Sequence, residues 1–330
     1  MIRAVKDYRK IIHWLSIGLF VVAASPAHAD DFTLPEGLQT VSDGRQPVQV
    51  LYDAYLGLLQ RGWLLEIIHR SQPVGLPFAL PIIALRSPQP GPAVWILSGI
   101  HGEEPAGPNA IAMVIDDIAS LGEKRPVVLL PLSNPHGYVR NWRYLNVATW
   151  SADVDGHSVG DASHWLPDPD RPEQPRASRP SSPEAAAITA YILRQAATYP
   201  PSHSIDLHED SLISEGYVYS QGTLGSADPL AKLAVRVLQQ NGIPLKLAGE
   251  TRFGEAITDG IIGPVEDSSL DELMSAAVVI ENGLQQPGPG TDTVLVFETP
   301  AGSLGLQRRI SAHADLLRAL VHELAGGKPD

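Results

Sequence analysis

Two histidines and one glutamate have the residue types and spacing of a catalytic metal site. His101 and Glu104 form a His-x-x-Glu pair within Ser-Gly-Ile-His-Gly-Glu-Glu-Pro, and His208 follows the short stretch Ile-Asp-Leu. Two imidazoles and one carboxylate are a common ligand set for one catalytic zinc ion, and they leave one position open for water. The alternative is that both histidines only form hydrogen bonds at strand ends. Their shared position after strands favours the metal site.

Neighbouring acidic residues offer an alternative and additions to this set. Glu103 adjoins Glu104, but the His-x-x-Glu spacing favours Glu104 as the ligand. Glu209 and Asp210 directly follow His208 and are candidates to orient the ligands through hydrogen bonds, with plain solvent exposure as the alternative. A second metal or substrate site is conceivable in a polar loop that contains Asp155, His157, Asp161 and His164, although a solvated loop is the simpler interpretation.

Glu298 is the candidate general base. It directly follows the apolar run Val-Leu-Val-Phe, which predicts a buried strand. A carboxylate at that position could deprotonate a zinc-bound water if its pKa is suitably tuned. The alternative is an ordinary solvated acid at a strand end.

The elements that must position these residues alternate between strands and helices. We therefore predict an α/β fold, a single domain with a mixed, mostly parallel central sheet and helices on both faces. His101, His208 and Glu298 each follow a strand, and such sheets bind ligands beyond the carboxyl ends of their strands. Residues 133–182 are predicted as a long polar loop. The predicted strands are 63–68, 78–86, 93–97, 126–131, 204–208, 276–280 and 293–297, and the predicted helices are 46–60, 108–120, 183–197, 229–241 and 303–325.

Composition excludes several classes of protein. The chain has 330 residues, of which 44% are hydrophobic and 18% charged, as is typical of a globular protein. It has no cysteine, which excludes disulfides, a thiolate nucleophile and Cys-ligated metal centres. Its net charge of −13 does not fit the basic surface of a nucleic-acid-binding protein. We therefore expect one catalytic domain over residues 30–330 and no nucleic-acid partner.

Residues 1–29 are predicted to be a cleaved signal peptide. A basic start is followed by an apolar run over 11–24 and then by Ala-His-Ala, which ends at Ala29. These are the three parts of a secretory signal. The apolar run is shorter than the roughly 20 residues that a membrane-spanning helix needs. We expect cleavage near Ala29 and a periplasmic or secreted mature chain without an integral membrane segment.

The motifs, taken in order, resemble those of the zinc metallocarboxypeptidase family, which has the carboxypeptidase A-like fold. His-Gly-Glu-Glu resembles the first ligand motif of the family, and Asp-Leu-His resembles the strand of its third ligand. The resemblance implies that His101, Glu104 and His208 bind one Zn²⁺ ion. Phe-Glu-Thr resembles the strand of the catalytic glutamate, which implies that role for Glu298. Arg-Asn-Trp-Arg resembles the family's Arg-x-x-Arg run, which implies that Arg143 polarises the substrate carbonyl.

Other segments depart from the family pattern. Asn-Pro-His-Gly resembles the family's Asn-Pro-Asp-Gly segment, with His136 in place of the aspartate. The family's Asn-Arg pair, which grips the terminal carboxylate of the substrate, has no counterpart in 153–161. Arg140 could replace that pair, because a guanidinium binds a carboxylate through two hydrogen bonds, and Asn141 is a further substrate-binding candidate. Leu270 aligns with the base of the family's specificity pocket, which would favour apolar over basic side chains.

The resemblance predicts an exported zinc-dependent metallopeptidase that hydrolyses amide bonds. A carboxypeptidase acting on peptides or peptidoglycan stem peptides is the first interpretation. Gly-Ile-His-Gly-Glu-Glu is also similar to deacylases of the succinylglutamate desuccinylase and aspartoacylase type, so a zinc-dependent deacylase or amidase is the alternative. A non-catalytic peptide- or glycan-binding module is a third hypothesis, which the presence of Glu298 disfavours because a binding module needs no general base.

Overall fold

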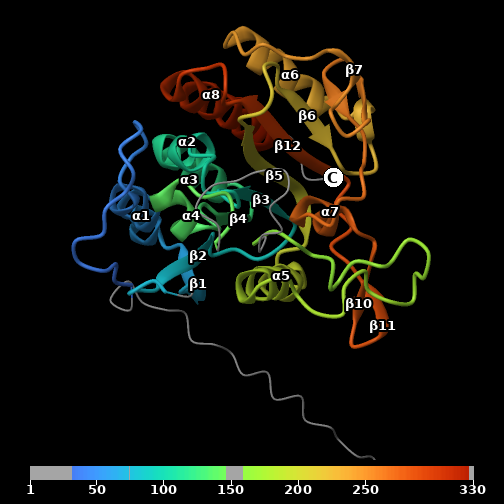
Figure 1. Cartoon of the computed structure of the whole chain (residues 1–330), viewed down its shortest axis with the longest axis horizontal. Helices are drawn as coiled ribbons and strands as arrows, with labels where there is room; N and C mark the ends of the chain where they lie inside the picture. The colour runs from blue at the N-terminus through green and yellow to red at the C-terminus, as the bar shows by residue number, and fades with distance from the viewer. Residues whose placement is uncertain (1–31, 74, 146–158, 327–330) are drawn as a thin grey trace, which may run out of the picture.

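The computed structural model describes residues 32–73, 75–145 and 159–326. Its strands are β1 (Leu64–Ser71), β2 (Leu80–Arg86), β3 (Ala93–Ser98), β4 (Val127–Leu130), β5 (Pro201–Asp210), β6 (Tyr217–Ser220), β7 (Ala248–Glu250), β8 (Ala256–Thr258), β9 (Ile261–Ile262), β10 (Val278–Glu281), β11 (Leu284–Pro287) and β12 (Thr293–Pro300). One ten-stranded sheet has the order β1-β2-β4-β3-β5-β12-β6-β9-β8-β7 (Figure 1). Its central strands β4, β3, β5 and β12 are parallel to one another. Antiparallel pairs flank this centre on both sides.

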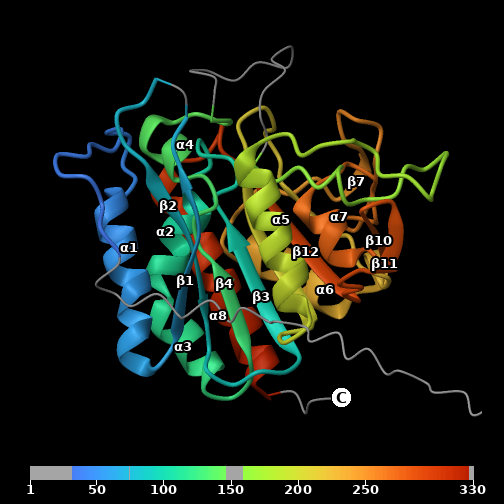
Figure 2. The ribbon, with the colours of Figure 1, turned by 90° about the horizontal axis from the view of Figure 1, so that it is seen from below.

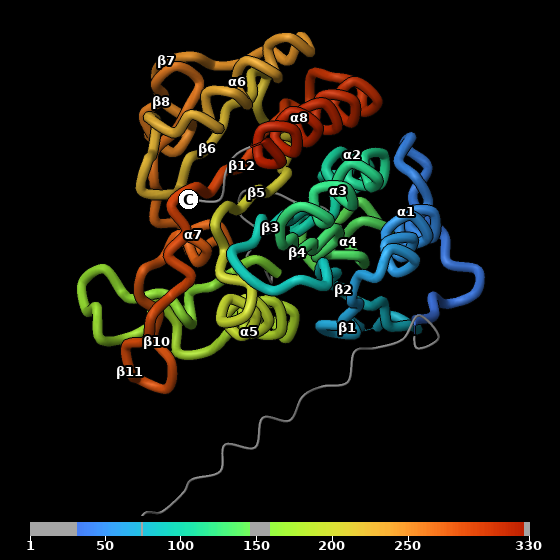
Figure 3. The backbone as a smooth tube through the Cα atoms, turned by 180° about the vertical axis from the view of Figure 1, so that it is seen from behind, coloured from blue at the N-terminus to red at the C-terminus, as the bar shows by residue number. Residues whose placement is uncertain are grey.

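Helices cover both faces of this sheet. They are α1 (Val48–Leu56), α2 (Ala106–Met113), α3 (Ile115–Gly122), α4 (Pro135–Arg140), α5 (Pro183–Ala196), α6 (Pro229–Gln240), α7 (Leu270–Ser275) and α8 (Leu306–Gly326). Figure 2 shows α5 in front of the sheet and α8 behind it. Seen from behind, α8 and α2 again lie on the side of the sheet opposite α5 (Figure 3). The chain is therefore a three-layer arrangement of helix, sheet and helix.

Alternation along the central strands divides the apolar side chains between two cores. On β3, Val94 and Ile96 pack into the core beneath α1, α2 and α8, while Trp95 and Leu97 pack into the core beneath α5 and α7. All four side chains are fully buried. A strand that is buried on both faces has a continuous apolar sequence, which explains why this run was recognisable as a central strand.

Capping residues define where two of the helices begin. The Ser182 hydroxyl accepts a hydrogen bond from the amide of Ala185, and Pro183 occupies the first position of α5. Asp228 caps α6 in the same way, and Pro229 follows it. Proline suits this position because the first amide of a helix has no intrahelical partner.

The predicted α/β architecture is confirmed, whereas several local predictions are corrected. The predicted helix 108–120 is two helices, α2 and α3, separated at Val114. The predicted strand 276–280 is β10, which pairs with β11 in a separate hairpin instead of joining the central sheet. The predicted loop 133–182 contains α4 at its start, where the Asn134 side chain caps the amide of Gly137.

The predicted signal peptide lies outside the described residues. Among the helices of the described ranges, none combines the length and the apolar character that crossing a membrane requires.

Candidate metal centre

The three predicted ligands come from two neighbouring strands at one edge of the sheet. β3 ends at Ser98, and Gly99 turns the chain with a φ of 67°, a conformation that glycine adopts without steric cost. His101 and Glu104 follow in this turn before α2 begins, and His208 lies near the end of β5. Because β3 and β5 are parallel, their carboxyl ends bring the three side chains together.

The turn that carries His101 is packed directly against α4. A Cβ atom on Gly102 would lie 2.0 Å from the carbonyl carbon of Gly137, so a larger residue would push the turn away from the helix. Arg45 supports the turn by donating from Nη1 to the carbonyl oxygens of Gly102 at 2.9 Å and Tyr138 at 2.6 Å. The predicted substrate-binding residue Asn141 belongs to this support, since its Oδ1 accepts from Nη2 of Arg45 at 2.6 Å.

His101, Glu104 and His208, which we name the metal-ligand cluster, converge on one point. Nδ1 of His101 lies 2.8 Å from Oε1 of Glu104, and Nδ1 of His208 lies 3.0 Å from Oε2 of the same carboxylate. The two imidazole rings are 5.1 Å apart between centroids. One nitrogen or oxygen atom from each side chain lies within 4.8 Å of the others. This donor set fits a zinc ion, which takes two histidines and one carboxylate in catalytic sites.

The charges of the cluster are coupled. Burial, with a further contribution from Arg143, lowers the pKa of His101 to about 4, which keeps its imidazole neutral as metal ligation requires. Burial opposes the charge of His208, but Asp206 and Glu104 raise its pKa well above the ordinary value. Burial also opposes the charge of Glu104, yet the two histidines hold its pKa well below the ordinary value.

Glu209 orients Glu104 from the next position on β5. Its backbone amide donates to Oε2 of Glu104 at 3.1 Å. Its own side chain is buried, accepts from the amide of Ala106 at 2.7 Å and pairs with Arg309 on α8. The contact with Glu104 thus comes from the backbone amide of Glu209 and not from its carboxylate, which was the predicted orienting group, and Asp210 pairs with Arg252 at 2.7 Å.

Asp206 and Asp271 were not singled out from the sequence, yet both lie beside His208. Oδ2 of Asp206 is 3.3 Å from Nε2 of His208, on the side of the ring that faces away from Glu104. Asp206, His208 and Asp271 form a second group whose ligand atoms lie within 4.8 Å of one another. Burial, reinforced by Asp206, raises the pKa of Asp271 well above its ordinary value. The alternation of a strand places residues two apart on one face, so the Asp-x-His pattern was the available signal for Asp206.

Glu298 lies next to the cluster through strand pairing. β12 runs parallel to β5 with Glu298 opposite His208. Oε2 of Glu298 is buried and has no hydrogen-bond partner among the described residues. Burial, together with the charges of Glu104 and Asp210, raises the pKa of Glu298 to about 8. A carboxyl group with a raised pKa next to an open metal position has the properties of a general acid–base residue.

The two predicted arginines lie in different surroundings. Nη1 of Arg143 donates to Glu104 at 2.8 Å and to Glu103 at 2.9 Å, so its guanidinium borders the metal-ligand cluster. Arg140 donates to Nδ1 of His136 at 2.9 Å and lies over the rings of Phe78 and Trp142. The structure therefore brings only Arg143 to the ligands.

A pocket opens beside the metal-ligand cluster. It has a volume of about 440 Å³ and is lined by Ile100, His101, Tyr144, Gly160, Asp161, Ser163, His208, Asp267, Ser268, Ser269, Leu270 and Asp271. The predicted specificity residue Leu270 therefore lines this pocket. Asp155 and His157 lie outside the described residues, and His164 contacts Thr189 at 3.2 Å. We name this space the acidic pocket because of Asp161, Asp267 and Asp271.

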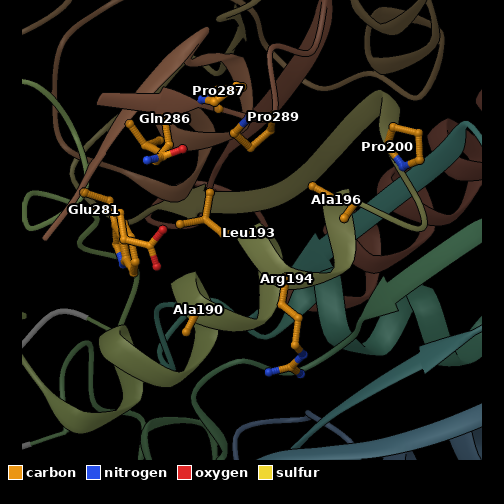
Figure 4. A pocket seen from close by; sticks show the side chains of 13 residues that line it. Ala190, Leu193, Arg194, Ala196, Pro200, Glu281, Gln286, Pro287 and Pro289 are labelled. Carbon is orange, nitrogen blue, oxygen red and sulfur yellow. The ribbon is translucent and has the colours of Figure 1, made fainter. Parts of the chain in front are cut away.

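A larger cavity lies elsewhere. It has a volume of about 590 Å³ and is formed between α5 and the β10–β11 hairpin. Figure 4 shows Leu193 of α5 opposite Gln286, Pro287 and Pro289 of the hairpin segment. None of the metal-ligand cluster lines this cavity, so its size alone does not make it the reaction site.

Comparisons with known proteins agree with this fold. No family model matches the sequence. A candidate metallopeptidase from Shewanella amazonensis aligns with a TM-score of 0.66 and 22% identity, covering 88% of this chain and 100% of that one. A second candidate metallopeptidase, from Shewanella denitrificans, aligns with a TM-score of 0.65 and 20% identity, covering 89% of this chain and 99% of that one.

A curated relative matches a short segment. Carboxypeptidase 2 of Trichophyton rubrum is 37% identical over 59 residues, which is 16% of this chain and 11% of that protein. The chain thus matches only a small part of the length of this relative. Together the structure comparisons show that the chain shares the fold of these candidate metallopeptidases and of a metallo-carboxypeptidase from Burkholderia cenocepacia, so the predicted resemblance to the zinc metallocarboxypeptidases is confirmed at the level of the fold.

Proposed function

We propose that this chain is an exported, zinc-dependent hydrolase of amide bonds. The observation that carries the proposal is the convergence of His101, Glu104 and His208 at one sheet edge, with Glu298 opposite His208 on the adjoining strand. The basic, apolar and small-residue parts of 1–29 support export. A zinc ion held by the three ligands would lower the pKa of a water molecule and polarise the substrate carbonyl.

The residues around the ligands supply the other catalytic roles: proton transfer, charge stabilisation and positioning. Glu298 takes a proton from the attacking water and returns it to the leaving amine, which is the role that its unpartnered Oε2 allows. The guanidinium of Arg143, which borders Glu104, stabilises negative charge that develops on the carbonyl oxygen. The backbone amide of Glu209 holds Glu104 in place from behind, and Arg309 pairs with the side chain of Glu209.

A peptidase is the first form of this hydrolase, and a deacylase or amidase is the second. Carboxypeptidase action on peptides or peptidoglycan stem peptides requires a cation for the terminal carboxylate of the substrate. Arg140, the predicted candidate, binds His136 and does not line the acidic pocket. This observation is a reason to retain the deacylase or amidase alternative, in which the substrate presents no free carboxylate at that position.

One experiment separates these forms. Purified protein is loaded with zinc, its metal content is measured, and matched peptides, N-acyl amino acids and muropeptides are incubated with it before mass spectrometry of the products. Chelator-sensitive cleavage only of peptides with a free carboxy terminus supports a carboxypeptidase, and equal cleavage of amidated peptides supports an amidase. Protein that binds no metal, or metal-loaded protein that cleaves no amide, contradicts the proposal.

A further inference from the structure

The helix α8 contacts the strands behind the metal-ligand cluster through two buried polar pairs. Arg309 pairs with Glu209, and Nε2 of His313 lies 2.9 Å from the hydroxyl oxygen of Thr299. Each of the four side chains is at most 7% exposed. Polar groups are costly at a buried interface unless they are hydrogen-bonded, so these pairs are specific points of contact between the helix and the sheet.

The two pairs match in spacing. Arg309 and His313 are four residues apart on α8, so they lie on one face of the helix. Glu209 and Thr299 are opposite each other on the parallel strands β5 and β12, so they lie on one face of the sheet. The helix is therefore joined to both strands at the same level, on the side of the sheet that it covers (Figure 2).

Thr299 lies directly behind the proposed general base. Leu295 and Phe297 precede it at alternate positions of β12 and pack into the core beneath α8. Because side chains alternate along a strand, Glu298 lies on the other face of the sheet, next to His208 on β5. A contact that fixes Thr299 from the side of α8 therefore also fixes the backbone from which Glu298 projects.

The end of β12 receives less support from the sheet than the rest of the strand. Its pairing with β6 ends where Glu298 is opposite Tyr217, whereas its pairing with β5 continues to Pro300. Pro300 has no amide hydrogen to donate. Beyond Glu298, the described sheet thus supports the strand from β5 alone, and the hydrogen bond to His313 is an additional restraint at this point.

His313 suits this role because it is a neutral partner. Burial, with Arg309 adding to it, lowers the pKa of His313 to about 3, so the ring adds no charge behind the catalytic carboxylate. Among the described residues, Thr299 is the only hydrogen-bond partner of the ring, since Nδ1 has none. An apolar pair of the same shape would cost little stability, so stability alone does not account for this pair.

We propose that His313 is a positioning residue for Glu298, and that it acts through the hydroxyl of Thr299 by holding the end of β12 in a fixed place beside the metal-ligand cluster. This inference rests on the proposed hydrolase function. Both side chains of the pair are fully buried, so neither contacts the substrate. A displacement of about 1 Å in a catalytic group can lower the rate by about 100-fold, which sets the size of the expected effect.

The first test removes the hydroxyl and keeps the shape of the side chain. Thr299→Val replaces the hydroxyl with a methyl group, whereas Thr299→Ser keeps the hydroxyl. With zinc-loaded protein and a peptide amide that the native chain cleaves, we expect kcat to fall by about 10- to 100-fold in Thr299→Val. KM should change by less than about twofold, since substrate binding is not altered. Thr299→Ser should retain most of the native kcat, and zinc content should be native in both variants.

A second variant approaches the same hydrogen bond from the helix. His313→Leu removes it and keeps the inference testable if Thr299→Val does not fold. The double variant should lose no more kcat than either single variant, because both changes delete one contact.

Thr189→Val is the matched control. Thr189 is fully buried on α5, and its hydroxyl donates to the carbonyl oxygen of Ala185 at 2.7 Å. The substitution removes a buried threonine hydroxyl far along the chain from Glu298. It should lower stability at most and leave kcat native.

Hydrogen–deuterium exchange provides a readout that needs no turnover. Zinc-loaded proteins are labelled and digested, and the exchange of the segment 293–300 is measured by mass spectrometry. Thr299→Val and His313→Leu should increase exchange in this segment, whereas Thr299→Ser and Thr189→Val should not. A crystal structure of Thr299→Val should show the Glu298 carboxylate displaced from its native place.

Three kinetic outcomes would overturn the inference. The first is native kcat in both Thr299→Val and His313→Leu, even with reduced stability, because the pair would then be purely structural. The second is an equal loss of kcat in Thr299→Val and Thr299→Ser, and the third is losses that add in the double variant. Increased exchange in both variants of a chain that cleaves no amide would contradict the proposed hydrolase and support the contact. Native exchange in both variants of such a chain would contradict both proposals.

Discussion

The two sides of the His208 ring differ in how completely their polar groups are paired. On the Nδ1 side, Oε1 of Glu104 contacts His101 and Arg143, and Oε2 contacts His208 and the amide of Glu209. On the Nε2 side and around it are buried oxygens of Asp206, Asp271 and Glu298 that accept no hydrogen bond from the described residues.

This difference separates two tasks within one site. The paired side holds its geometry before any ligand arrives, as metal ligands require. The unpaired acids repel one another and carry raised pKa values at Asp271 and Glu298, chiefly because of burial. A carboxyl group with a raised pKa exchanges protons closer to neutral pH than an ordinary one does. The following predictions test this contrast, beginning with the largest effect.

Removing the imidazole should abolish metal binding. His208→Ala deletes the ring that both sides share, so we expect no stoichiometric zinc after dialysis against micromolar zinc, measured by atomic absorption. His203→Ala removes a histidine from the start of the same strand and serves as the control, with full zinc content expected. Full occupancy in His208→Ala would refute the ligand assignment.

Neutralising the base on the unpaired side should affect turnover and spare the metal. Glu298→Gln preserves the shape of the side chain, and loss of a general base lowers kcat by roughly a hundredfold to ten-thousandfold. Zinc content should remain that of the native chain. Glu281→Gln, on the exposed hairpin, is the control. Near-normal kcat in Glu298→Gln would remove Glu298 from the mechanism.

Breaking the support of the paired side should destabilise the fold. Arg309→Met leaves Glu209 buried without its ion pair, and loss of one partner of a buried pair costs about 3–5 kcal/mol. Urea unfolding at pH 8 measures the change, with Arg308→Met on the more exposed side of α8 as the matched control. The double variant Glu209→Gln, Arg309→Met should recover part of the loss, and equal stability of the two single arginine variants would contradict the prediction.

Altering the carboxylate behind His208 should weaken metal binding without removing it. Asp206→Asn replaces the group that faces Nε2, and loss of such a partner typically lowers metal affinity by about 10- to 100-fold. Competition with a fluorescent chelator measures the zinc Kd. Asp210→Asn, further along the same strand, should keep the native affinity. An unchanged Kd in Asp206→Asn would show that Nε2 does not depend on this contact.

His136 is a buried histidine outside the metal-ligand cluster, and both of its ring nitrogens have partners. Its Nε2 donates to the carbonyl oxygen of Ser71 at 2.9 Å, and its Nδ1 accepts from Arg140 at 2.9 Å. Burial, with Arg140 adding to it, lowers the pKa of His136 to about 4. The unfolded chain therefore binds this proton near pH 6.5 while the folded chain does not.

The consequence is a loss of stability in acid. The free energy of unfolding should fall by about 2 kcal/mol from this residue as the pH decreases from about 6.5 to about 4. Urea unfolding at pH 7, 5.5 and 4.5 measures it. His136→Asn cannot take up the proton, so its stability should vary less over this range. Identical pH dependence in the two proteins would contradict the assignment.

The sequence was sufficient to predict the parts of the site that depend on local pattern. The apolar runs of β3 and β12 identified buried strands, and together with the predicted strand 204–208 they located His101, His208 and Glu298. The pairing of Asp206 with Asp271 was not predictable, because it depends on how α7 docks against β5, a contact between distant parts of the chain. The helix α4 was missed because its six residues lie within 133–182, a stretch rich in polar residues and proline that predicted a loop.

The order of the ligand strands has a consequence for how the site is assembled. His101 and Glu104 are neighbours in sequence, whereas His208 and Glu298 arrive on β5 and β12, which are synthesised much later. Contacts between such distant segments form slowly, because a long loop must close before they contribute. A refolding chain should therefore acquire tight metal binding only after β3 and β5 have paired, and hydrolytic competence only after β12 has joined them. Metal uptake followed in time would then report the completion of the central sheet.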